Sequence, residues 1–502
     1  MQKRTKMWVG VLAGVLVLGA LTGCGQEQST EGSAKPELKV LMNYMKEDPN
    51  TYPVAKDLEE ATGYSVKYYT LPQDKPEEKL NLIMASNEAY DIIITTNNLR
   101  VSWADYAKKG ALLELDSLVD QYGTNMKKVM KPESFDLMRM DGKLYGIPVP
   151  KIKIGKSLNY TSMLVTRSDM LEKSGAKYPE TLDEFTAMLR AMQTAGADGE
   201  TIAPLCIKQA IELPGIVGAF GVPNPWNEVD GKLVNRAEDP RYLEYIKYMK
   251  SLYEEGLLDR EFPVNKSATL TEKFSSGRAA IIPITYSEAG TISDALEKTS
   301  PGAELTFLDA VTGANGEKGI GTGESSLDRL VFIPKTAEHP EDAVKYMDAK
   351  LDEETFKLVA IGREGEHYTV ENGEYFPISP KFFDERGSAN NYLTGINEET
   401  YPQYWQTRVR KDQAVYDAYA YMSLDDERLE DAVANPALDA PVFDSDKYVK
   451  IVNQMANDYF IKVIAGEEDL ESSYDEFLEN WRQEGGAAIS QDLNNWYQNK
   501  AK

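Results

Sequence analysis

Residues 38–69 read LKVLMNYMKEDPNTYPVAKDLEEATGYSVKYY and carry a strand, helix, strand pattern. Leu38–Met42 is short and largely apolar, as expected of a buried strand. Pro53 suits the first turn of a helix and Gly63 suits its end. Residues 63–69 then alternate between polar and apolar side chains, which predicts a second strand. A strand, helix, strand unit of this kind is typical of an α/β fold with a mostly parallel sheet.

The same alternation continues after this unit. Residues 76–85 have a helical pattern, and the run YDIII at Tyr90–Ile94 predicts a buried strand. In open α/β sheets, ligands bind beyond the carboxyl ends of the strands. We therefore expect Asn43 and the segment 95–103, which ends with Trp103, at the edge of a binding site.

A second α/β region follows. Met163–Val165 predicts a strand, and residues 180–192, ETLDEFTAMLRAM, predict a helix with a capping box between Thr181 and Glu184. Further apolar strands are expected at residues 279–284 and 330–333, and helices from residue 448 onward. The chain is therefore predicted to form two α/β lobes with a largely helical C-terminal extension.

The N-terminus has the pattern of a secreted lipoprotein. Three basic residues precede the uncharged run Met7–Leu21, which is shorter than the roughly 20 residues of a membrane span and is typical of a signal peptide. Leu21–Cys24 (LTGC) resembles a bacterial lipobox, so Cys24 is the expected lipid-bearing residue. A plain signal peptide with an accidental cysteine is the alternative, but an A-x-A-like cleavage site is missing. Residues 24–36 predict a flexible tether.

Charge and composition disfavour several classes of protein. The net charge is −26, and removal of residues 1–23, with three basic and no acidic side chains, would lower it to −29. Such an acidic surface disfavours binding to nucleic acid or to anionic membrane headgroups. Cys206, the other cysteine, stands between apolar residues and is expected to be a buried hydrophobe, so no internal disulfide is expected.

Catalytic and metal-binding patterns are sparse. His339 and His367 are the only histidines, which are too few for a multi-histidine metal site and make a catalytic triad difficult to build. No P-loop, nucleophile elbow or dinucleotide fingerprint occurs, so we expect no cofactor, no metal and no enzyme activity. Paired carboxylates could still hydrolyse glycosides, and with 81 acidic residues their presence decides nothing.

Several stretches together resemble one family. In chain order they are NLIMASNEAYDIIITT, DGKLYGIPVP, LVTRSDMLEKSGAKYPETLDEF, DGKLVN, YMKSLYEEGLLDREF, SSGRAAIIPITY, IGREGEHYT and YDEFLENWRQEGGAAISQDLNNWY. This ordered set resembles the large lipid-anchored branch of the family 1 extracellular solute-binding proteins, the maltose-binding-protein-like receptors of ABC importers. The resemblance implies a two-lobed, type II periplasmic-binding-protein-like fold with a hinge. It also implies a solute, usually an oligosaccharide, bound between the lobes and delivered to membrane permease subunits.

The resemblance and the patterns together predict the domain organisation. The expected parts are a lipoprotein signal peptide at 1–23, a tether at 24–36, the first part of lobe 1 at 37–150, the first part of lobe 2 at 151–310, a return to lobe 1 at 311–370, and a mainly helical extension completing lobe 2 and the cleft at 371–502. Some members of the branch carry a calcium loop after the helix that here ends near Gln193. This chain has ADGET at 197–201 instead, and two carboxylates do not supply the six to eight oxygens that calcium needs. We therefore expect no calcium there.

Sugar binding requires aromatic and planar polar side chains. Aromatic rings stack on the apolar faces of pyranose rings, at roughly 1 kcal/mol each, and sugar hydroxyls cannot be buried unpaired. After the tryptophan of the leader and those on the C-terminal helices are set aside, Trp103, Trp226 and Trp405 remain as candidates. Packing within a loop is the equal alternative for each. The resemblance adds Tyr286, because related receptors often carry an aromatic residue after that strand.

A basic cluster lies at the predicted crossing between the lobes. It consists of Lys151, Lys153 and Lys156, of which the first two would share one strand face. A solvated face is the default interpretation. The alternative is that Lys153 and its neighbours favour anionic sugars such as uronates.

Together these patterns predict a lipid-anchored, monomeric receptor on the outer face of the cytoplasmic membrane. It would close around an oligosaccharide and release it unchanged to its permease. Two other functions stay open: a lipid-anchored glycoside hydrolase, and a sensor lipoprotein that reports its bound state to a membrane kinase. The same fold would serve the sensor, so only the partner would distinguish it.

Overall fold

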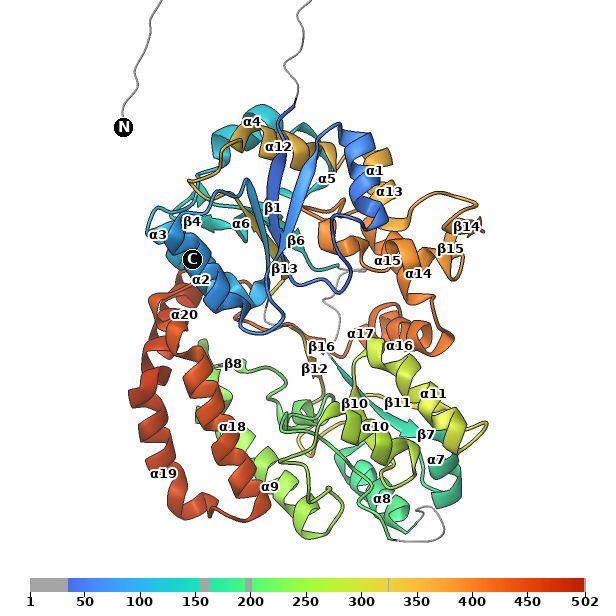
Figure 1. The fold of residues 1–502 in the computed structure, drawn as a ribbon. Helices are drawn as coiled ribbons and strands as arrows, with labels where there is room; N and C mark the ends of the chain where they lie inside the picture. The colour runs from blue at the N-terminus through green and yellow to red at the C-terminus, as the bar shows by residue number, and fades with distance from the viewer. Residues whose placement is uncertain (1–34, 153–161, 195–200, 324, 501–502) are drawn as a thin grey trace, which may run out of the picture. The chain divides into compact units, whose positions relative to one another are not determined.

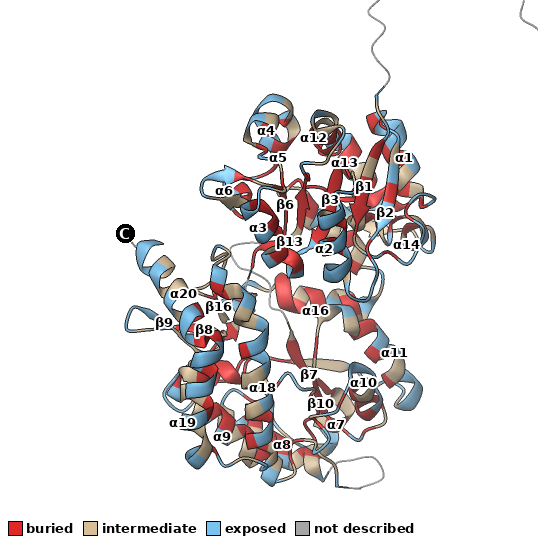
Figure 2. Cartoon of the chain, turned by 60° about the vertical axis from the view of Figure 1, so that its left-hand side comes forward, coloured by how far each residue is buried: buried red, intermediate tan, exposed pale blue. Residues whose placement is uncertain are grey.

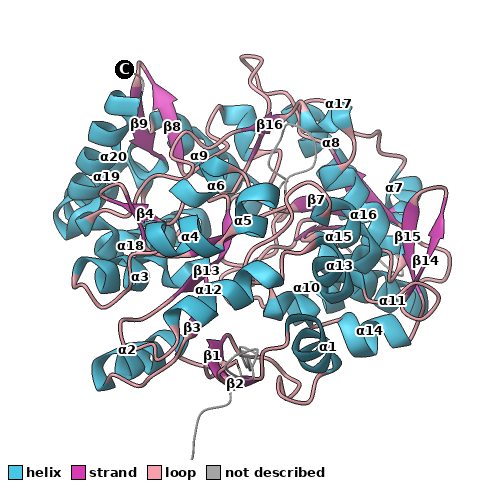
Figure 3. Cartoon of the chain, turned by 90° about the horizontal axis from the view of Figure 1, so that it is seen from above, coloured by secondary structure: helices cyan, strands magenta, loops and turns pink. Residues whose placement is uncertain are grey.

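The computed structural model describes residues 35–152, 162–194, 201–323 and 325–500. Cys24, Lys153, Lys156 and residues 197–200 of the predicted calcium-free loop lie outside this part of the chain. Within it, a five-stranded and a three-stranded β-sheet are the main sheets, and four two-stranded sheets are smaller. Helices make up most of the regular structure (Figures 1 and 3). The fold is the predicted two-lobed α/β fold.

The first lobe is built on a five-stranded sheet. Its strand order is β2 (Val66–Thr70), β1 (Leu38–Met42), β3 (Ile92–Thr96), β13 (Leu327–Phe332) and β6 (Ile147–Pro150). β1 pairs in parallel with both β2 and β3, whereas β13 is antiparallel to both β3 and β6. The sheet is therefore parallel where strands alternate with helices, and antiparallel where the chain returns from the second lobe.

The opening unit of the sequence forms as predicted. Helix α1 (Pro53–Thr62) begins at Pro53 and ends at Gly63, which has φ of +68°. Glycine adopts this left-handed conformation readily because it has no Cβ. β2 begins at Val66 and runs parallel to β1.

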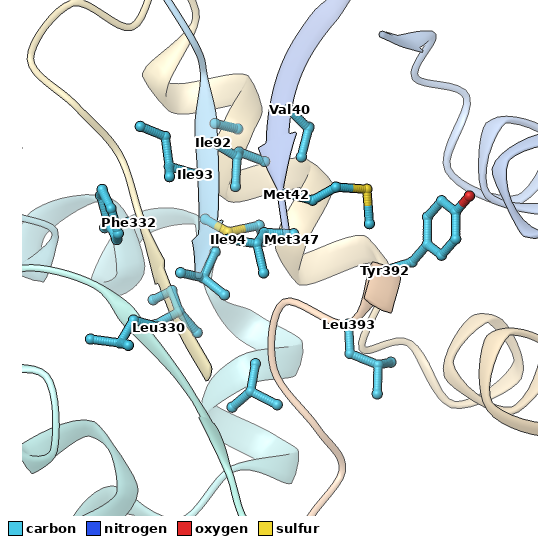
Figure 4. Packing of buried hydrophobic residues seen from close by; sticks show 14 of the residues in the cluster. Val40, Met42, Ile92, Ile93, Ile94, Leu330, Phe332, Met347, Tyr392 and Leu393 are labelled. Atoms are coloured by element: carbon cyan, nitrogen blue, oxygen red, sulfur yellow. The ribbon is translucent and has the colours of Figure 1, made fainter. Parts of the chain in front are cut away.

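The core of the first lobe lies on both sides of this sheet. Figure 4 shows Val40, Ile92, Ile94, Leu330 and Phe332 packed together within it, and each of them is at most 1% exposed. Sheets covered by helices on both faces bury nearly continuous apolar strands, which explains why YDIII does not alternate. Buried residues concentrate in these strands, and exposed ones on the outer sides of the helices (Figure 2).

Helices and short strands complete the first lobe. They are α2 (Pro76–Ser86), η1 (Asn97–Leu99), α3 (Arg100–Lys108), α4 (Asp116–Tyr122), α5 (Thr124–Val129), α6 (Pro132–Asp136), β4 (Arg139–Met140), β5 (Lys143–Leu144), α12 (Pro340–Ala349), α13 (Glu353–Ile361), β14 (Tyr368–Glu371), β15 (Glu374–Pro377), α14 (Lys381–Arg386), η6 (Ala389–Tyr392) and α15 (Tyr401–Val409). Phe382, Tyr392 and Tyr404 belong to the core of this lobe. The chain thus stays with the first lobe well beyond residue 370, where we expected it to leave, because these aromatic side chains pack against α1 and α13.

The second lobe has a smaller sheet. β7 (Met163–Arg167) lies between β10 (Ile281–Ile284) and β11 (Leu305–Leu308) and is antiparallel to both. The alternation of strands and helices suggested a parallel sheet, but here the long connections return the chain in the opposite direction. Helix α8 (Leu182–Gln193) begins with the predicted capping box between Thr181 and Glu184.

The remaining elements of the second lobe are mostly helical. They are α7 (Ser168–Ser174), η3 (Val217–Phe220), β8 (Trp226–Val229), β9 (Lys232–Asn235), η4 (Arg236–Glu238), α9 (Pro240–Glu254), α10 (Ser267–Ser275), η5 (Tyr286–Glu288), α11 (Ala289–Thr299), β12 (Ile320–Gly321), α16 (Gln413–Ser423), α17 (Asp426–Leu429), β16 (Ala432–Val433), η7 (Asp444–Tyr448), α18 (Val449–Ala465), α19 (Leu470–Trp481), η8 (Arg482–Gly486) and α20 (Ala487–Lys500). The C-terminal helices share a core with α9, to which Phe460 and Trp481 contribute.

The chain passes from one lobe to the other at three places. The first lies between β6 and β7, and the second lies between β11 and β13. The third is the short connection between α15 and α16. These connections bring residues of both lobes to one region of the molecule. Among the described residues, no helix has the length and apolar character needed to span a membrane.

Candidate functional site

A hollow of about 350 Å³ lies where the connections between the lobes meet. We call it the central hollow. The first lobe contributes Asp328 and Arg329 of β13 and Trp405 of α15, and the second lobe contributes Tyr286 of η5 and Tyr419 of α16. A ligand in this hollow would contact both lobes.

Aromatic side chains form much of the wall. The rings of Tyr286 and Tyr419 meet edge to face, with 5.3 Å between their centroids, and Trp405 lies 6.0 Å from Tyr401 in a similar arrangement. Burial raises the pKa of the Tyr286 hydroxyl, and a hydrogen bond from the Trp405 indole acts in the opposite direction. Trp405 of the first lobe and Tyr286 of the second lobe therefore line the same hollow.

The sequence of α15 explains how Trp405 reaches the hollow. Tyr401 and Tyr404 are buried in the core of the first lobe. Trp405 follows Tyr404 by one position, so its side chain points in a different direction around the helix. It lies at the edge of the core and is only partly buried. The guanidinium of Arg408 lies 5.5 Å from the centroid of the Trp405 ring, where it holds the indole in place.

Tyr419 carries a hydroxyl group that has no hydrogen-bond partner among the described residues. The side chain is 1% exposed, and no described group hydrogen-bonds its hydroxyl oxygen. A buried hydroxyl without a hydrogen bond costs free energy. Since Tyr419 lines the central hollow, a ligand hydroxyl there could supply the missing bond.

Charged groups complete the central hollow. Arg329 Nε lies 3.3 Å from Asp328 Oδ2, and Arg329 also donates to the carbonyl oxygen of Asn390. Lys151 is exposed at the first connection between the lobes. Its backbone N–H donates to the carbonyl oxygen of Ser326 at 2.6 Å, which holds this connection against β13.

Two further hollows adjoin the central one, each of about 410 Å³. The first, which we call the middle hollow, shares Lys151, Gly323 and Ser325 with the central hollow and extends toward Asn97 at the end of β3. The second shares Lys151 and extends toward α6. Lys151 thus borders all three hollows.

The structure places the predicted site residues in different environments. Trp405 and Tyr286 come together in the central hollow. Trp103, in contrast, is 1% exposed in the core of the first lobe, where its indole N–H donates to the carbonyl oxygen of Tyr145 at 3.2 Å. Helix α3 packs the face that carries Trp103 against the core, so the indole does not face the central hollow. The segment that follows β3 nevertheless contributes to the hollows as predicted, because Asn97 lines the middle hollow.

The other predicted residues do not line these three hollows. Asn43, just after β1, is partly buried, and Trp226 lies on β8, paired with Asn235 and packed against the core of the second lobe. Lys153 lies outside the described residues. Sequence reasoning missed Arg329, Asn390 and Tyr419, since each belongs to an element whose pattern indicates only a strand or helix.

One group of side chains among the described residues could hold a metal ion. It consists of Glu366, His367 and Glu385. The His367 Nδ1 already accepts from the backbone N–H of Arg363 at 3.0 Å, and Nε2 lies 3.0 Å from Glu385 Oε2. His367 is fully buried, and this burial lowers its pKa. Because both ring nitrogens are engaged, we interpret the cluster as structural.

Comparison with known proteins identifies the family. Residues 45–354 match the model of the bacterial extracellular solute-binding proteins. Lipoprotein LipO of Bacillus subtilis is 26% identical over 523 residues, which cover 98% of this chain and 98% of LipO. The polygalacturonan/rhamnogalacturonan-binding protein YtcQ of the same organism is 26% identical over 524 residues, covering 96% of this chain and 97% of YtcQ.

A solved structure shares the fold. The Streptococcus pneumoniae ABC-transporter substrate binding protein FusA in complex with kestose aligns with a TM-score of 0.74 at 18% identity, covering 93% of this chain and 99% of FusA. The chain belongs to the bacterial extracellular solute-binding proteins, which confirms the resemblance found in the sequence.

Proposed function

We propose that this solute-binding protein captures an acidic oligosaccharide for an ABC importer. The observation that carries the proposal is the central hollow, where aromatic side chains of both lobes stand beside Lys151 and Arg329. Rings and charged planar groups in one hollow suit a ligand with apolar faces, hydroxyls and carboxylates.

The aromatic wall supports a carbohydrate ligand. Tyr286, Trp405 and Tyr419 line one hollow from two lobes, and stacking on pyranose faces stabilises the complex by roughly 1 kcal/mol for each ring. The Tyr419 hydroxyl has no partner in the described part of the chain and would gain a hydrogen bond from a sugar hydroxyl. Both contacts would be lost if the lobes moved apart, so the ligand would favour the closed form.

Lys151 supports an acidic ligand. It borders three hollows in a protein whose net charge is −26, so it supplies positive charge at the site of an otherwise acidic protein. YtcQ, whose name records binding of polygalacturonan and rhamnogalacturonan, aligns with nearly the whole chain. A uronate-containing oligosaccharide is therefore the ligand that we propose.

The protein would bind its ligand without altering it. Asp328 is the one carboxylate among the described residues that line the central hollow. Glycoside hydrolysis by the usual mechanism requires two carboxyl groups placed about the scissile bond. This observation favours the receptor over the glycosidase alternative.

The N-terminal pattern supports attachment to the membrane. Cys24 follows the lipobox-like LTGC, and residues 24–36 would tether the folded body at the outer face of the cytoplasmic membrane. There the closed receptor would deliver its cargo to the permease subunits. A Cys24→Ser variant should be released into the medium instead of staying with the membrane fraction. Retention of that variant would contradict the anchor.

Calorimetry tests the proposed ligand. The mature chain should bind oligogalacturonates, with weaker or no binding of neutral malto-oligosaccharides of the same length. Bound ligand should also raise the thermal midpoint, because it stabilises the folded state by RT ln(1 + [L]/Kd). Chromatography of the recovered sugar should show no shortening. A preference for the neutral series, or turnover of either series, would overturn the proposal.

A further inference from the structure

The second lobe carries a hollow that the proposed function does not yet use. It measures about 490 Å³ and lies between α9 and α18. We call it the outer hollow. Tyr242 of α9 contributes to its wall, as do Asn453, Asn457 and Phe460 of α18, two helices that contact each other (Figure 1).

Shared residues connect the outer hollow to the central one. The outer and middle hollows have Glu212, Pro225 and Arg236 in common. The middle and central hollows in turn share Lys151 and Gly323, among others. The three hollows therefore follow one another, from Trp405 at one end to α18 at the other.

A fixed charged pair stands between the middle and outer hollows. Arg236 Nη1 lies 2.7 Å from Glu212 Oε1, and the Tyr242 hydroxyl donates to the same oxygen at 2.8 Å. Arg236 Nε also donates to the carbonyl oxygen of Asn224 at 2.9 Å. Held in this way, the carboxylate of Glu212 is presented to both hollows. Preorganised planar groups of this kind bind sugar hydroxyls without a further cost in side-chain entropy.

The far wall offers two side-chain amides that have no hydrogen-bond partner within the described part of the chain. Asn453 and Asn457 are four residues apart on α18, so their side chains lie on the same face of the helix. Neither side chain hydrogen-bonds another residue in the described ranges, and both line the outer hollow. Each amide has donors and an acceptor available for hydroxyl groups.

We propose that the outer hollow is a further saccharide subsite, so that the ligand is a linear oligosaccharide long enough to pass the Glu212–Arg236 pair. One end of the chain would stack on Trp405, and the other would hydrogen-bond Asn453 and Asn457. This inference rests on the proposed function, because it extends the same ligand beyond the central hollow. It adds that the receptor selects for chain length and prefers longer oligomers.

Calorimetry with oligogalacturonates of increasing defined length tests this inference. The affinity of the mature chain should keep rising as the oligomer grows past the length that fills the central hollow, and then level off. In the double variant Asn453→Ala/Asn457→Ala, the longest oligomers should bind about tenfold more weakly, as expected for two lost hydrogen bonds. The shortest binding oligomer should be unaffected. Alanine favours the helix more than asparagine, so α18 should remain folded.

A matched control comes from the same helix. The Gln454 side chain is exposed and donates to Asp458 at 2.7 Å, and it does not line the hollow. Gln454→Ala should leave the affinity unchanged at every length. Two results would overturn the subsite without contradicting the central site. One is an affinity that levels off at the shortest binding oligomer, and the other is equal weakening of short and long oligomers by the double variant. No binding at any length would contradict the proposed function and the subsite together.

Discussion

The core of the first lobe and the central hollow use the same residue types for different purposes. In the core, Trp103 is 1% exposed and donates to a backbone carbonyl oxygen. In the hollow, Trp405 is partly exposed and lines the wall together with Tyr286 of the other lobe. Both tryptophans are sugar-binding candidates on the sequence alone, and only their surroundings separate them.

Two lysines show the same contrast. Lys350 is 4% exposed in the first lobe, where its ammonium donates to the carbonyl oxygen of Tyr392 and lies 4.8 Å from the centroid of the Tyr346 ring. Burial lowers its pKa to about 7. Lys151, in contrast, is exposed and borders three hollows. Residue type thus indicates which chemistry is available, whereas burial decides whether it serves stability or binding.

Substitution of Trp103 should have the largest effect. Trp103→Ala would leave a cavity in the core and an unpaired carbonyl oxygen at Tyr145. Loss of a buried tryptophan costs roughly 3–5 kcal/mol of the free energy of unfolding. Urea unfolding would measure this loss, and the affinity of the remaining folded protein should be unchanged.

Trp103→Phe provides the control for this prediction. Phenylalanine keeps much of the apolar contact, so its cost should be clearly smaller than that of alanine. If Trp103→Ala kept normal stability and lost ligand affinity instead, Trp103 would be a site residue, and the contrast between the two regions would fail.

Lys350 should make stability depend on pH. Its pKa is about 7 in the folded chain, against the ordinary value of 10.5. Between these values the unfolded chain binds a proton that the folded chain has released, so the free energy of unfolding rises with pH. Lys350→Met removes this dependence. The stability of the variant relative to the native protein should therefore fall by up to about 3 kcal/mol from about pH 7.5 to 10.

An exposed lysine of the same lobe is the matched control. The Lys56 side chain on α1 is 81% exposed. The free energy of unfolding of Lys56→Met, relative to that of the native protein, should stay nearly constant over the same pH range. Urea unfolding at each pH would measure it. A flat difference for Lys350→Met as well would show that Lys350 does not titrate in this range.

Much of the fold could be predicted because its signals are local. Pro53 and Gly63 mark the ends of α1, and Thr181 with Glu184 marks the start of α8. Each signal lies within or next to the helix that it marks. The return of α14 to the first lobe could not be predicted in this way. Its position depends on aromatic packing against α13 and against α1, and α1 is distant in sequence.

The site was only partly predictable for a related reason. Trp405 stands out by residue type and context, and Tyr286 by the family resemblance, yet nothing in the sequence shows that they meet. Tyr419 has the same helical pattern as a core residue, and its unpaired hydroxyl becomes evident only in the folded chain. Trp103 has a suitable position after β3, but α3 turns it into the core.

Trp405 should matter mainly for binding. Trp405→Ala removes one stacking face from the wall of the central hollow. With roughly 1 kcal/mol for a stacked ring, the affinity for oligogalacturonate should fall about fivefold or more. Calorimetry would measure this, with Trp496→Ala on α20 as the control, because that tryptophan packs against the second lobe outside the hollows. Equal weakening by both variants would mean that the loss is not specific to the hollow.

Lys151 should have the smallest effect, and one that depends on the charge of the ligand. An exposed ion pair contributes about 0.2–1 kcal/mol, so Lys151→Met should weaken oligogalacturonate binding by at most about fivefold. The loss should shrink as salt is added, because salt screens exposed charges. Lys56→Met changes the net charge equally and should leave affinity unchanged. If both variants weakened binding alike, the general charge of the surface would explain the effect, because Lys151 borders the hollows and Lys56 does not.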